Sequence, residues 1–378
     1  MAGVYIHIPF CKTRCHYCDF YKLTDFNAKA DFLSALRKEI VLRKNELSGE
    51  QINTIYFGGG TPSVLKAGET GGIMELIGSV YDLDPDAEIT LEANPDDLNV
   101  SFARELLGAG INRLSIGIQS FGNQDLKNMN RRHDAARALA CIDAVREAGF
   151  TNLSIDLIYG LPDQDLAAWE ENVNKAVGLK ADHVSAYHLT YHKGTVFYNY
   201  LKRGKIKEIP DELSFAQFNK LRELLVDAGY EHYEISNFAR DKQYSKHNRS
   251  YWERKNYLGF GPSAHSFDQR TRRWNISNLK KYLSAVENDQ VFWKTEILSE
   301  QDQYNDFMIT SLRTMWGISQ QELDEAFQVK YSRHFRKEAV PFMETGHMLF
   351  DGTCYTLSEK GLFISDTIME KLLFVESA

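Results

Sequence analysis

The sequence predicts an α/β fold built on a parallel sheet, followed by a small, mainly helical domain. Up to about residue 190, short runs rich in Val, Ile, Leu, Tyr and Phe alternate with longer amphipathic stretches, which gives six β-then-α units in succession. Such units favour parallel strands joined by right-handed crossovers. After about residue 295 the pattern becomes helical. Periodicity alone leaves two closures open: a doubly wound open sheet, or a (β/α) barrel that is complete or partial.

The six predicted strands are short and apolar, and most end at a glycine or a polar residue. They are Val4–Ile8, Ile52–Phe57, Glu88–Glu92, Arg113–Ile118, Leu153–Ile158 and His183–His188. A barrel collects the C-terminal ends of its strands at one mouth, where its chemistry lies. Polar residues recur at or just past those ends, and this favours a barrel: His7, the turn Gly58–Thr61, Glu92, Gln119, Asp156 and His188.

Amphipathic patterns between and after the strands predict the helices. Apolar residues recur with a period of about 3.6 in the stretches Ala28–Leu47, Ala135–Ala148, Leu166–Val177 and Asp211–Ala228. Residues from about 230 to 290 are less regular and rich in aromatic side chains. Beyond them, three short helices, a hairpin around Gly352 and a last helix suggest a winged-helix-like module: Gln301–Thr314, Ser319–Phe327, Ser332–Met343 and Ser358–Leu372. We therefore expect two domains, 1–290 and 291–378.

The composition argues against several classes of protein. The 378 residues include 44 Lys and Arg against 52 Asp and Glu, and the net charge of −8 argues against a nucleic-acid partner. No apolar run approaches the ~20 residues that cross a bilayer, and the N-terminus lacks the pattern of a signal peptide. We therefore expect a cytoplasmic protein. Five cysteines are too few for a disulfide framework, but three of them lie within eight residues.

Those three cysteines form a C-x3-C-x2-C pattern, Cys11 to Cys18, directly after the first predicted strand. Thiolates at this spacing can converge on one site from a single loop. A structural zinc ion takes four ligands, and a 4Fe–4S cluster usually takes four cysteines, so three would leave one iron open to another ligand. The alternatives are three free thiols, or zinc completed by His7 or His16. The spacing favours the iron–sulfur cluster.

A glycine-rich segment, Tyr56-Phe57-Gly58-Gly59-Gly60-Thr61-Pro62, follows the second predicted strand. Glycines let backbone N–H groups approach a ligand closely. A glycine triplet by itself is more simply a tight turn. Together with the cysteine pattern, however, the segment favours ligand binding.

With these two motifs the chain resembles the radical S-adenosylmethionine family. Further segments resemble the subgroup of oxygen-independent coproporphyrinogen III oxidases and haem chaperones, over essentially the whole chain: Val4–Cys11, Leu91–Pro95, Gly117–Phe121, Ile155–Pro162 and Ser311–Ile318. The resemblance implies a partial (β/α)6 barrel with a HemN-type, winged-helix-like C-terminal domain. It assigns a 4Fe–4S cluster to Cys11, Cys15 and Cys18. It assigns S-adenosylmethionine, or the pocket around it, to Tyr5, Tyr17, Gly59, Gly60, Thr61, Glu92, Gln119, Arg131 and Asp156.

Two departures distinguish the chain from the oxidases of this subgroup. An oxidase carries a fourth cysteine two residues after the third, where this chain has Phe20, and it has an extension before the residue that matches Tyr5. The segment from His247 to Trp252 instead resembles the H-N-x-x-Y-W signature of the haem chaperones. The candidate haem contacts are therefore His247, Tyr251 and Trp252, because His and Tyr can ligate haem iron. The simpler interpretation of this segment is aromatic packing.

The resemblance thus implies a haem chaperone that binds haem, a 4Fe–4S cluster and S-adenosylmethionine and delivers haem to respiratory haemoproteins. It assigns no catalytic residue and leaves open whether S-adenosylmethionine is cleaved. The alternative is an oxygen-independent coproporphyrinogen III oxidase, which decarboxylates its substrate through a radical, and a radical enzyme with another substrate is the third. A homodimer and peripheral association with the inner face of the membrane are both compatible with the chaperone function.

Overall fold

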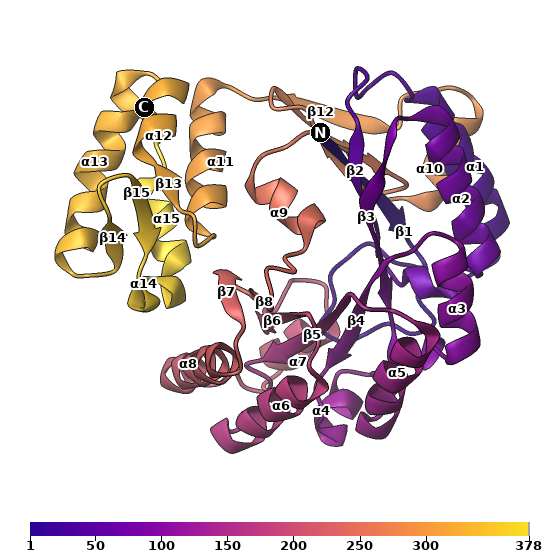
Figure 1. The fold of residues 1–378 in the computed structure, drawn as a ribbon, viewed down its shortest axis with the longest axis horizontal. Helices are drawn as coiled ribbons and strands as arrows, with labels where there is room; N and C mark the ends of the chain where they lie inside the picture. The colour runs from indigo at the N-terminus through magenta and orange to yellow at the C-terminus, as the bar shows by residue number, and fades with distance from the viewer. Residues whose placement is uncertain (377–378) are drawn as a thin grey trace.

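Six parallel strands form the centre of the large sheet in the computed structural model, which describes residues 1–376 (Figure 1). Each is hydrogen-bonded to the next along the chain. They are β1 (Ala2–Ile8), β2 (Ile52–Gly59), β3 (Leu83–Ala93), β4 (Arg113–Gln119), β5 (Leu153–Tyr159) and β6 (His183–His188). The sheet curves without closing on itself, so the predicted partial (β/α)6 barrel is confirmed.

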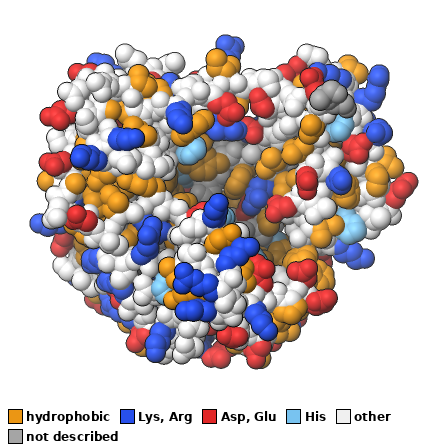
Figure 2. All heavy atoms as spheres, turned by 180° about the vertical axis from the view of Figure 1, so that it is seen from behind, with side chains coloured by type: hydrophobic (Ala, Val, Ile, Leu, Met, Phe, Trp, Pro, Cys, Tyr) orange, Lys and Arg blue, Asp and Glu red, His pale blue; other side chains and the backbone are white. Residues whose placement is uncertain are grey.

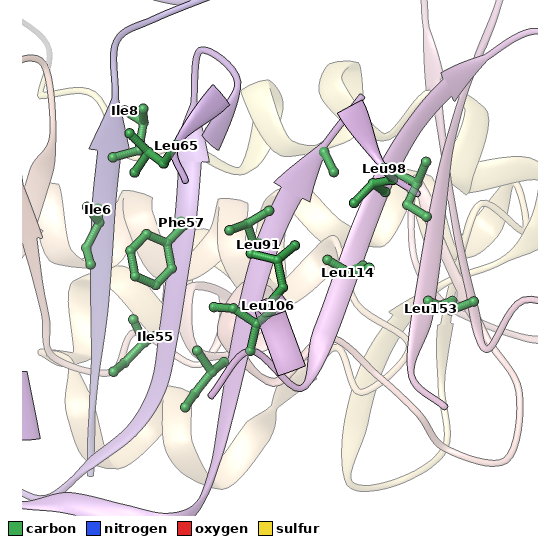
Figure 3. Close-up of a cluster of buried hydrophobic side chains, with 14 of the residues drawn as sticks. Ile6, Ile8, Ile55, Phe57, Leu65, Leu91, Leu98, Leu106, Leu114 and Leu153 are labelled. Carbon is green, nitrogen blue, oxygen red and sulfur yellow. The ribbon is translucent and has the colours of Figure 1, made fainter. Parts of the chain in front are cut away.

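The two faces of these strands differ in polarity. Side chains on the outer face form one apolar core with the helices, as Figure 3 shows for Ile6, Phe57, Leu91, Leu114 and Leu153. The helices between the strands are α1 (Lys29–Leu42), α2 (Ala67–Val80), α3 (Val100–Gly108), α4 (Asn123–Asn128), α5 (Ala135–Ala148) and α6 (Leu166–Leu179). The alternate residues, which face the barrel interior, are largely polar or aromatic: Tyr5, His7, Thr54, Tyr56, Glu92, Arg113, Ser115, Ser154, Asp156 and Ser185.

Local capping explains several helix ends. The Asp134 side chain accepts a hydrogen bond from the backbone of Arg137 at the start of α5, and Gly149 ends that helix with φ of 112°. The predicted helix over Ala28–Leu47 instead ends at Leu42. Beyond that end, the Arg43 side chain turns into the core, where it is 2% exposed and bonds to Glu39.

Short strands extend the sheet at both edges: β9 pairs parallel with β1, whereas the others pair antiparallel with their neighbours. β8 (Asn237–Ala239) lies beside β6 and β7 (Glu231–Glu234) lies beyond it at the edge, and β9 to β12 continue outward from β1. The latter are β9 (Tyr257–Phe260), β10 (His265–Phe267), β11 (Thr271–Asn275) and β12 (Trp293–Ile297). α7 (Val196–Lys202), α8 (Asp211–Asp227), α9 (Lys246–Trp252) and α10 (Leu279–Glu287) complete this part of the chain. β12 extends the main sheet beyond the predicted domain boundary after residue 290.

The C-terminal domain follows β12 and has its own apolar core, which includes Phe307, Leu323 and Phe335. Its elements are α11 (Glu300–Leu312), β13 (Ile318–Ser319), α12 (Gln320–Ala326), α13 (Val329–Glu344), β14 (Met348–Phe350), β15 (Cys354–Leu357), α14 (Glu359–Phe363) and α15 (Ser365–Leu372). The hairpin after α13 and the preceding helices give the predicted winged-helix-like arrangement. The single last helix predicted for Ser358–Leu372 is in fact two helices that meet at Ile364.

Polar contacts join the two parts of the molecule. Arg313 at the end of α11 pairs with Glu234 of β7 at 2.8 Å, and Arg254 pairs with Glu322 at 2.7 Å. Seen from behind, the surface is hollowed near the middle of the molecule (Figure 2). Over residues 1–376, we find no helix with the length and apolar character that a bilayer crossing requires.

Candidate cofactor and substrate cavity

A cavity of about 460 Å³ occupies the interior of the barrel. Its wall brings together residues from the cysteine loop and from the inward faces of β2 to β6. Of the residues predicted from the sequence, it contains Cys11, Cys15, Cys18, Tyr17, Gly59, Gly60, Thr61, Glu92, Gln119, Arg131 and Asp156. Tyr5 does not line the cavity; its ring stacks behind that of Tyr56, with centroids 6.2 Å apart.

Hydrogen bonds hold the cysteine loop over the mouth of the barrel. The buried ammonium of Lys22 donates to the backbone oxygens of Cys18 at 2.6 Å and Phe20 at 3.2 Å. Nδ1 of His16 is hydrogen-bonded to the carbonyl of Asn128 at 2.7 Å, which ties the loop to α4. Phe20 itself is 64% exposed and borders the cavity. The loop is thus positioned by its own lysine and by the end of a neighbouring helix.

The cysteine sulfurs have donors beside them. The hydroxyl of Thr61 donates to Cys11 Sγ at 3.3 Å, and the guanidinium of Arg131 donates to Cys15 Sγ at 3.4 Å. Donors in these positions stabilise thiolates that ligate a metal. Burial raises the pKa of the Cys11 thiol to about 11, so a metal that binds there must displace a proton.

The donor set fits an iron–sulfur cluster better than a single zinc ion. Among residues 1–376, no three His, Cys, Asp or Glu side chains converge as ligands of one metal ion. The two histidines considered as zinc ligands are engaged elsewhere, since His7 Nε2 bonds to the Tyr21 carbonyl at 2.9 Å and His16 bonds to α4. An iron–sulfur cluster does not require its ligands to converge on one ion, because its three thiolates bind three different iron atoms.

The glycine-rich turn packs against β1. A Cβ atom on Gly59, whose φ is +103°, would lie 2.5 Å from the His7 ring, and one on Gly60 would lie 2.7 Å from the carbonyl oxygen of Ile8. The turn therefore needs glycine for its own packing. The same packing presents its backbone to the cavity, so the structural and the ligand-binding interpretations of the motif are compatible.

Two buried acids, Glu92 and Asp156, line the cavity. Burial, with the charge of Asp156 nearby, raises the pKa of Glu92 to about 7, although the Tyr56 hydroxyl donates to Glu92 at 2.9 Å. Burial likewise raises the pKa of Asp156 to about 6, although the hydroxyl of Ser115 donates to it at 3.2 Å. Both groups can accept hydrogen bonds from a ligand, and both change protonation near neutral pH.

Arg131 lies at the mouth of the cavity, and hydrogen bonds fix the orientation of its guanidinium. Its Nη2 donates to Asn94 Oδ1 and to the Gly117 carbonyl, each at 2.6 Å. Its Nε is buried without a partner in the part of the chain that the structure describes. A guanidinium held in this way can bind a carboxylate.

The segment proposed for haem contact lies in α9, between the barrel and the C-terminal domain (Figure 1). His247 is 1% exposed and both of its ring nitrogens are occupied: Nδ1 lies 2.8 Å from Thr54 Oγ1 and Nε2 lies 2.8 Å from the Tyr251 hydroxyl. The Trp252 ring packs under the guanidinium of Arg313, at 5.0 Å. Ligation of iron by His247 therefore requires these hydrogen bonds to break, and the haem contacts remain predictions.

Sequence reasoning missed several residues of the cavity wall: Asn94, Arg113, Ser115, Ser154, Ser185, Tyr187 and Asn248. Most of them alternate with apolar residues on β4, β5 and β6. Parallel strands covered by helices usually carry apolar side chains on both faces, so this alternation was a usable signal for a polar interior.

Two family models match the chain. The model of the radical SAM superfamily matches residues 5–176, and that of the HemN C-terminal domain matches residues 298–364. A heme chaperone HemW from Bacillus subtilis is 35% identical over 96% of this chain and 92% of its own length. One from Lactococcus lactis is 31% identical over 98% of this chain and 97% of its own length.

A solved structure also resembles the whole chain. The coproporphyrinogen III oxidase HemN from Escherichia coli, described as a radical SAM enzyme, has a TM-score of 0.85 and 25% identity. The match covers 98% of this chain and 90% of that protein. The fold is therefore shared with an enzyme, whereas the two bacterial relatives named above, which are more similar in sequence, are chaperones by name.

Proposed function

The chain belongs to the radical S-adenosylmethionine superfamily, in the subgroup of HemW and HemN, and from this membership we propose that it is a haem chaperone. The observation that carries the choice is the full-length similarity to HemW. The site supports it, because the position of the fourth cysteine of the oxidases is occupied by Phe20, an exposed side chain at the mouth of the cavity.

In this proposal Cys11, Cys15 and Cys18 hold a 4Fe–4S cluster. Such a cluster, when bound, supplies one open iron and an electron that can cleave S-adenosylmethionine reductively. The glycine turn Gly59–Thr61 and Arg131 bind the amino and carboxylate groups of S-adenosylmethionine at the mouth of the barrel. Glu92 and Asp156 accept hydrogen bonds from its ammonium or ribose.

The chaperone binds haem through α9 and delivers it to respiratory haemoproteins. His247, Tyr251 and Trp252 are the residues that we assign to haem. His247 is inserted in the barrel and Trp252 contacts Arg313 of the C-terminal domain. Haem binding therefore has to draw α9 out of this position. Dimerisation and association with the inner face of the membrane, where respiratory haemoproteins lie, are part of the same proposal.

Oxygen-independent decarboxylation of coproporphyrinogen III is the second candidate function. The match to HemN over 98% of this chain favours it, as does the presence of Gln119, Arg131 and Asp156 in the cavity. The Phe20 substitution argues against it.

One sample separates the two functions. Protein reconstituted anaerobically with iron and sulfide is titrated with haem and, in parallel, is incubated with coproporphyrinogen III, S-adenosylmethionine and a reductant. Stoichiometric haem binding without decarboxylated product supports the chaperone. Formation of protoporphyrinogen together with 5′-deoxyadenosine would establish the oxidase instead.

A further inference from the structure

The two edges of the large sheet end differently. At one edge the C-terminal domain pairs with β7, through a β-bridge between Glu234 and Thr314. At the other edge β12 is the last strand in the sheet order, and no strand in the described part of the chain pairs with its outer side. An open edge of this kind presents unpaired backbone donors and acceptors to a further strand.

β12 is exposed on both of its faces. Lys294 and Glu296 lie on one face, because side chains alternate along a strand. Thr295 and Ile297 lie on the other, and all four side chains are exposed. Ile297 is 81% exposed, and Val291, which precedes the strand, is 70% exposed. Neither face is therefore covered by a helix of the described chain, and another chain can reach the edge.

The pairing with β11 identifies which backbone groups of β12 are free. The N–H of Leu298, which directly follows β12, donates to the carbonyl of Arg270 at 2.9 Å, so Leu298 faces β11. The register between the two strands is regular along β12. Successive residues of such a strand direct their backbone groups to opposite sides. The free N–H and C=O groups, which point to the open side, are therefore those of Trp293, Thr295 and Ile297.

The sequence of β12 is complementary to itself when two copies pair antiparallel about a two-fold axis at Thr295. In this register the free groups of Thr295 meet those of its own counterpart. Trp293 lies opposite Ile297 of the second copy, which pairs two apolar side chains. Lys294 lies opposite Glu296 of the second copy, which pairs opposite charges. Apolar pairs and pairs of opposite charge that lie directly across antiparallel strands are both stabilising.

Neighbouring registers lack this complementarity. A shift by one residue brings free backbone groups opposite groups that already bond to β11. The next registers that oppose free groups to free groups place either Lys294 or Glu296 opposite its own counterpart. Like charges directly opposite each other are destabilising. The backbone and the charges thus select the same register, in which Thr295 lies on the axis.

We propose that β12 is the surface through which two copies of this chain associate, by antiparallel pairing of their β12 strands about a two-fold axis at Thr295. The same patch is used on both copies, so the assembly closes at a dimer. The contact of five residues on each copy is small, and we expect the dimer to dissociate reversibly. The dimer is part of the proposed function, on which this inference rests, whereas the position of the interface follows from β12 alone.

Charge reversal tests the register. Lys294→Glu opposes acids in both cross-strand charge pairs, and Glu296→Lys opposes lysines, so we expect each variant to raise the dimer dissociation constant about tenfold. A 1:1 mixture of the two variants restores opposite charges in both pairs, and heterodimers should form with an affinity close to that of wild type. Sedimentation equilibrium of the reconstituted full-length proteins measures this. The control Lys371→Glu reverses an exposed charge on α15 and should dimerise like wild type.

Thr295→Pro tests the backbone pairing. Proline has no N–H, but an edge strand tolerates it where that group would face solvent, so β12 should stay paired with β11. Across the two-fold axis the variant loses both hydrogen bonds that residue 295 donates. We expect its dimer dissociation constant to rise about tenfold or more. Thr295→Val keeps the N–H and should dimerise like wild type.

The outcomes separate this inference from the proposed function. A wild type that stays monomeric at every concentration overturns the interface together with the proposed dimer. A dimer of equal affinity in wild type, Thr295→Pro and both charge variants overturns the interface and leaves the proposed function intact. Association as expected, in protein that fails to bind haem in a titration, supports the interface and contradicts the chaperone. If Thr295→Pro does not fold, the mixture decides: heterodimers no tighter than the homodimers of either charge variant overturn the pairing.

Discussion

His247 of α9 stacks on Tyr56 of β2 inside the barrel, with ring centroids 5.1 Å apart and ring planes inclined by 23°. The Tyr56 hydroxyl donates to Glu92, on the wall of the cavity that we assign to S-adenosylmethionine. The segment proposed for haem is therefore in contact with the structure around the proposed cofactor. A change at one of the two sites should be measurable at the other.

Thr54→Val tests whether His247 must leave the barrel to reach haem. The substitution removes the hydrogen bond between Thr54 Oγ1 and His247 Nδ1, and we expect a loss of about 1 kcal/mol in the free energy of unfolding. The same loss lowers the cost of withdrawing α9, so haem affinity should rise by about fivefold. Haem titration checks this, with Thr310→Val in the C-terminal domain as the control. A lower haem affinity in Thr54→Val would contradict withdrawal of His247.

Glu92 should make stability depend on pH. Its pKa is raised by burial from the ordinary value of 4.5 to about 7. A raised pKa means that the folded state favours the protonated acid, so this contribution to stability is complete below about pH 4.5 and is lost as the pH rises through about 7. We expect the contribution to be of the order of 1–3 kcal/mol.

Urea unfolding of the metal-free protein at pH 5 and at pH 8 measures this dependence. Glu92→Gln, which cannot ionise, should lose less stability between the two pH values than wild type. Equal losses in the two proteins would show that Glu92 is not the titrating group.

The cysteine loop should be essential for iron. Cys18→Ala removes one of the three predicted cluster ligands, and we expect most of the iron and sulfide to be lost after anaerobic reconstitution. Cys354→Ala, which removes a thiol in the C-terminal hairpin, is the matched control and should retain both. Chemical analysis of iron and sulfide provides the measurement. Unchanged iron content in Cys18→Ala would contradict the assignment of a cluster to these cysteines.

Two glycine substitutions distinguish the effect of close packing on stability from the effect of helix propensity. Gly60→Ala places a Cβ atom 2.7 Å from one backbone oxygen and 2.8 Å from another. We therefore expect the free energy of unfolding to fall by about 1–3 kcal/mol. Gly78 lies in α2, where a Cβ atom would meet no atom within 4 Å. Because alanine favours the helix more than glycine does, we expect Gly78→Ala to raise the free energy of unfolding by about 0.5–1 kcal/mol. Thermal unfolding of both variants checks the contrast. A Gly60→Ala protein as stable as wild type would show that the turn can move away from β1.

The sequence predicted the central strands closely because their boundaries carry local signals. The strand His183–His188 and the helix Ala135–Ala148 coincide with the observed elements, the helix because Asp134 and Gly149 cap its ends. The region from 230 to 290 was not predicted. Its strands are three to five residues long, too short for periodicity to emerge.

Only the part of the candidate site that lies at the strand ends was predicted from the sequence. Motifs at the strand ends identify the cysteine loop and the glycine turn. The rest of the site depends instead on contacts between distant segments, such as Thr54 with His247 and Glu88 with the start of α9. No local pattern encodes those contacts, so the insertion of His247 could not be derived from the sequence.

The most direct test of the chaperone proposal is the rate of haem transfer. Haem-loaded protein is mixed with membrane vesicles that contain a respiratory haemoprotein in its apo form, or with apomyoglobin, and the loss of haem is followed by absorbance. A chaperone passes haem by direct contact, so we expect a rate that rises with the concentration of the respiratory apoprotein and exceeds the rate to apomyoglobin. One rate for both acceptors, independent of their concentration, would mean that haem leaves by simple dissociation and would contradict the proposal.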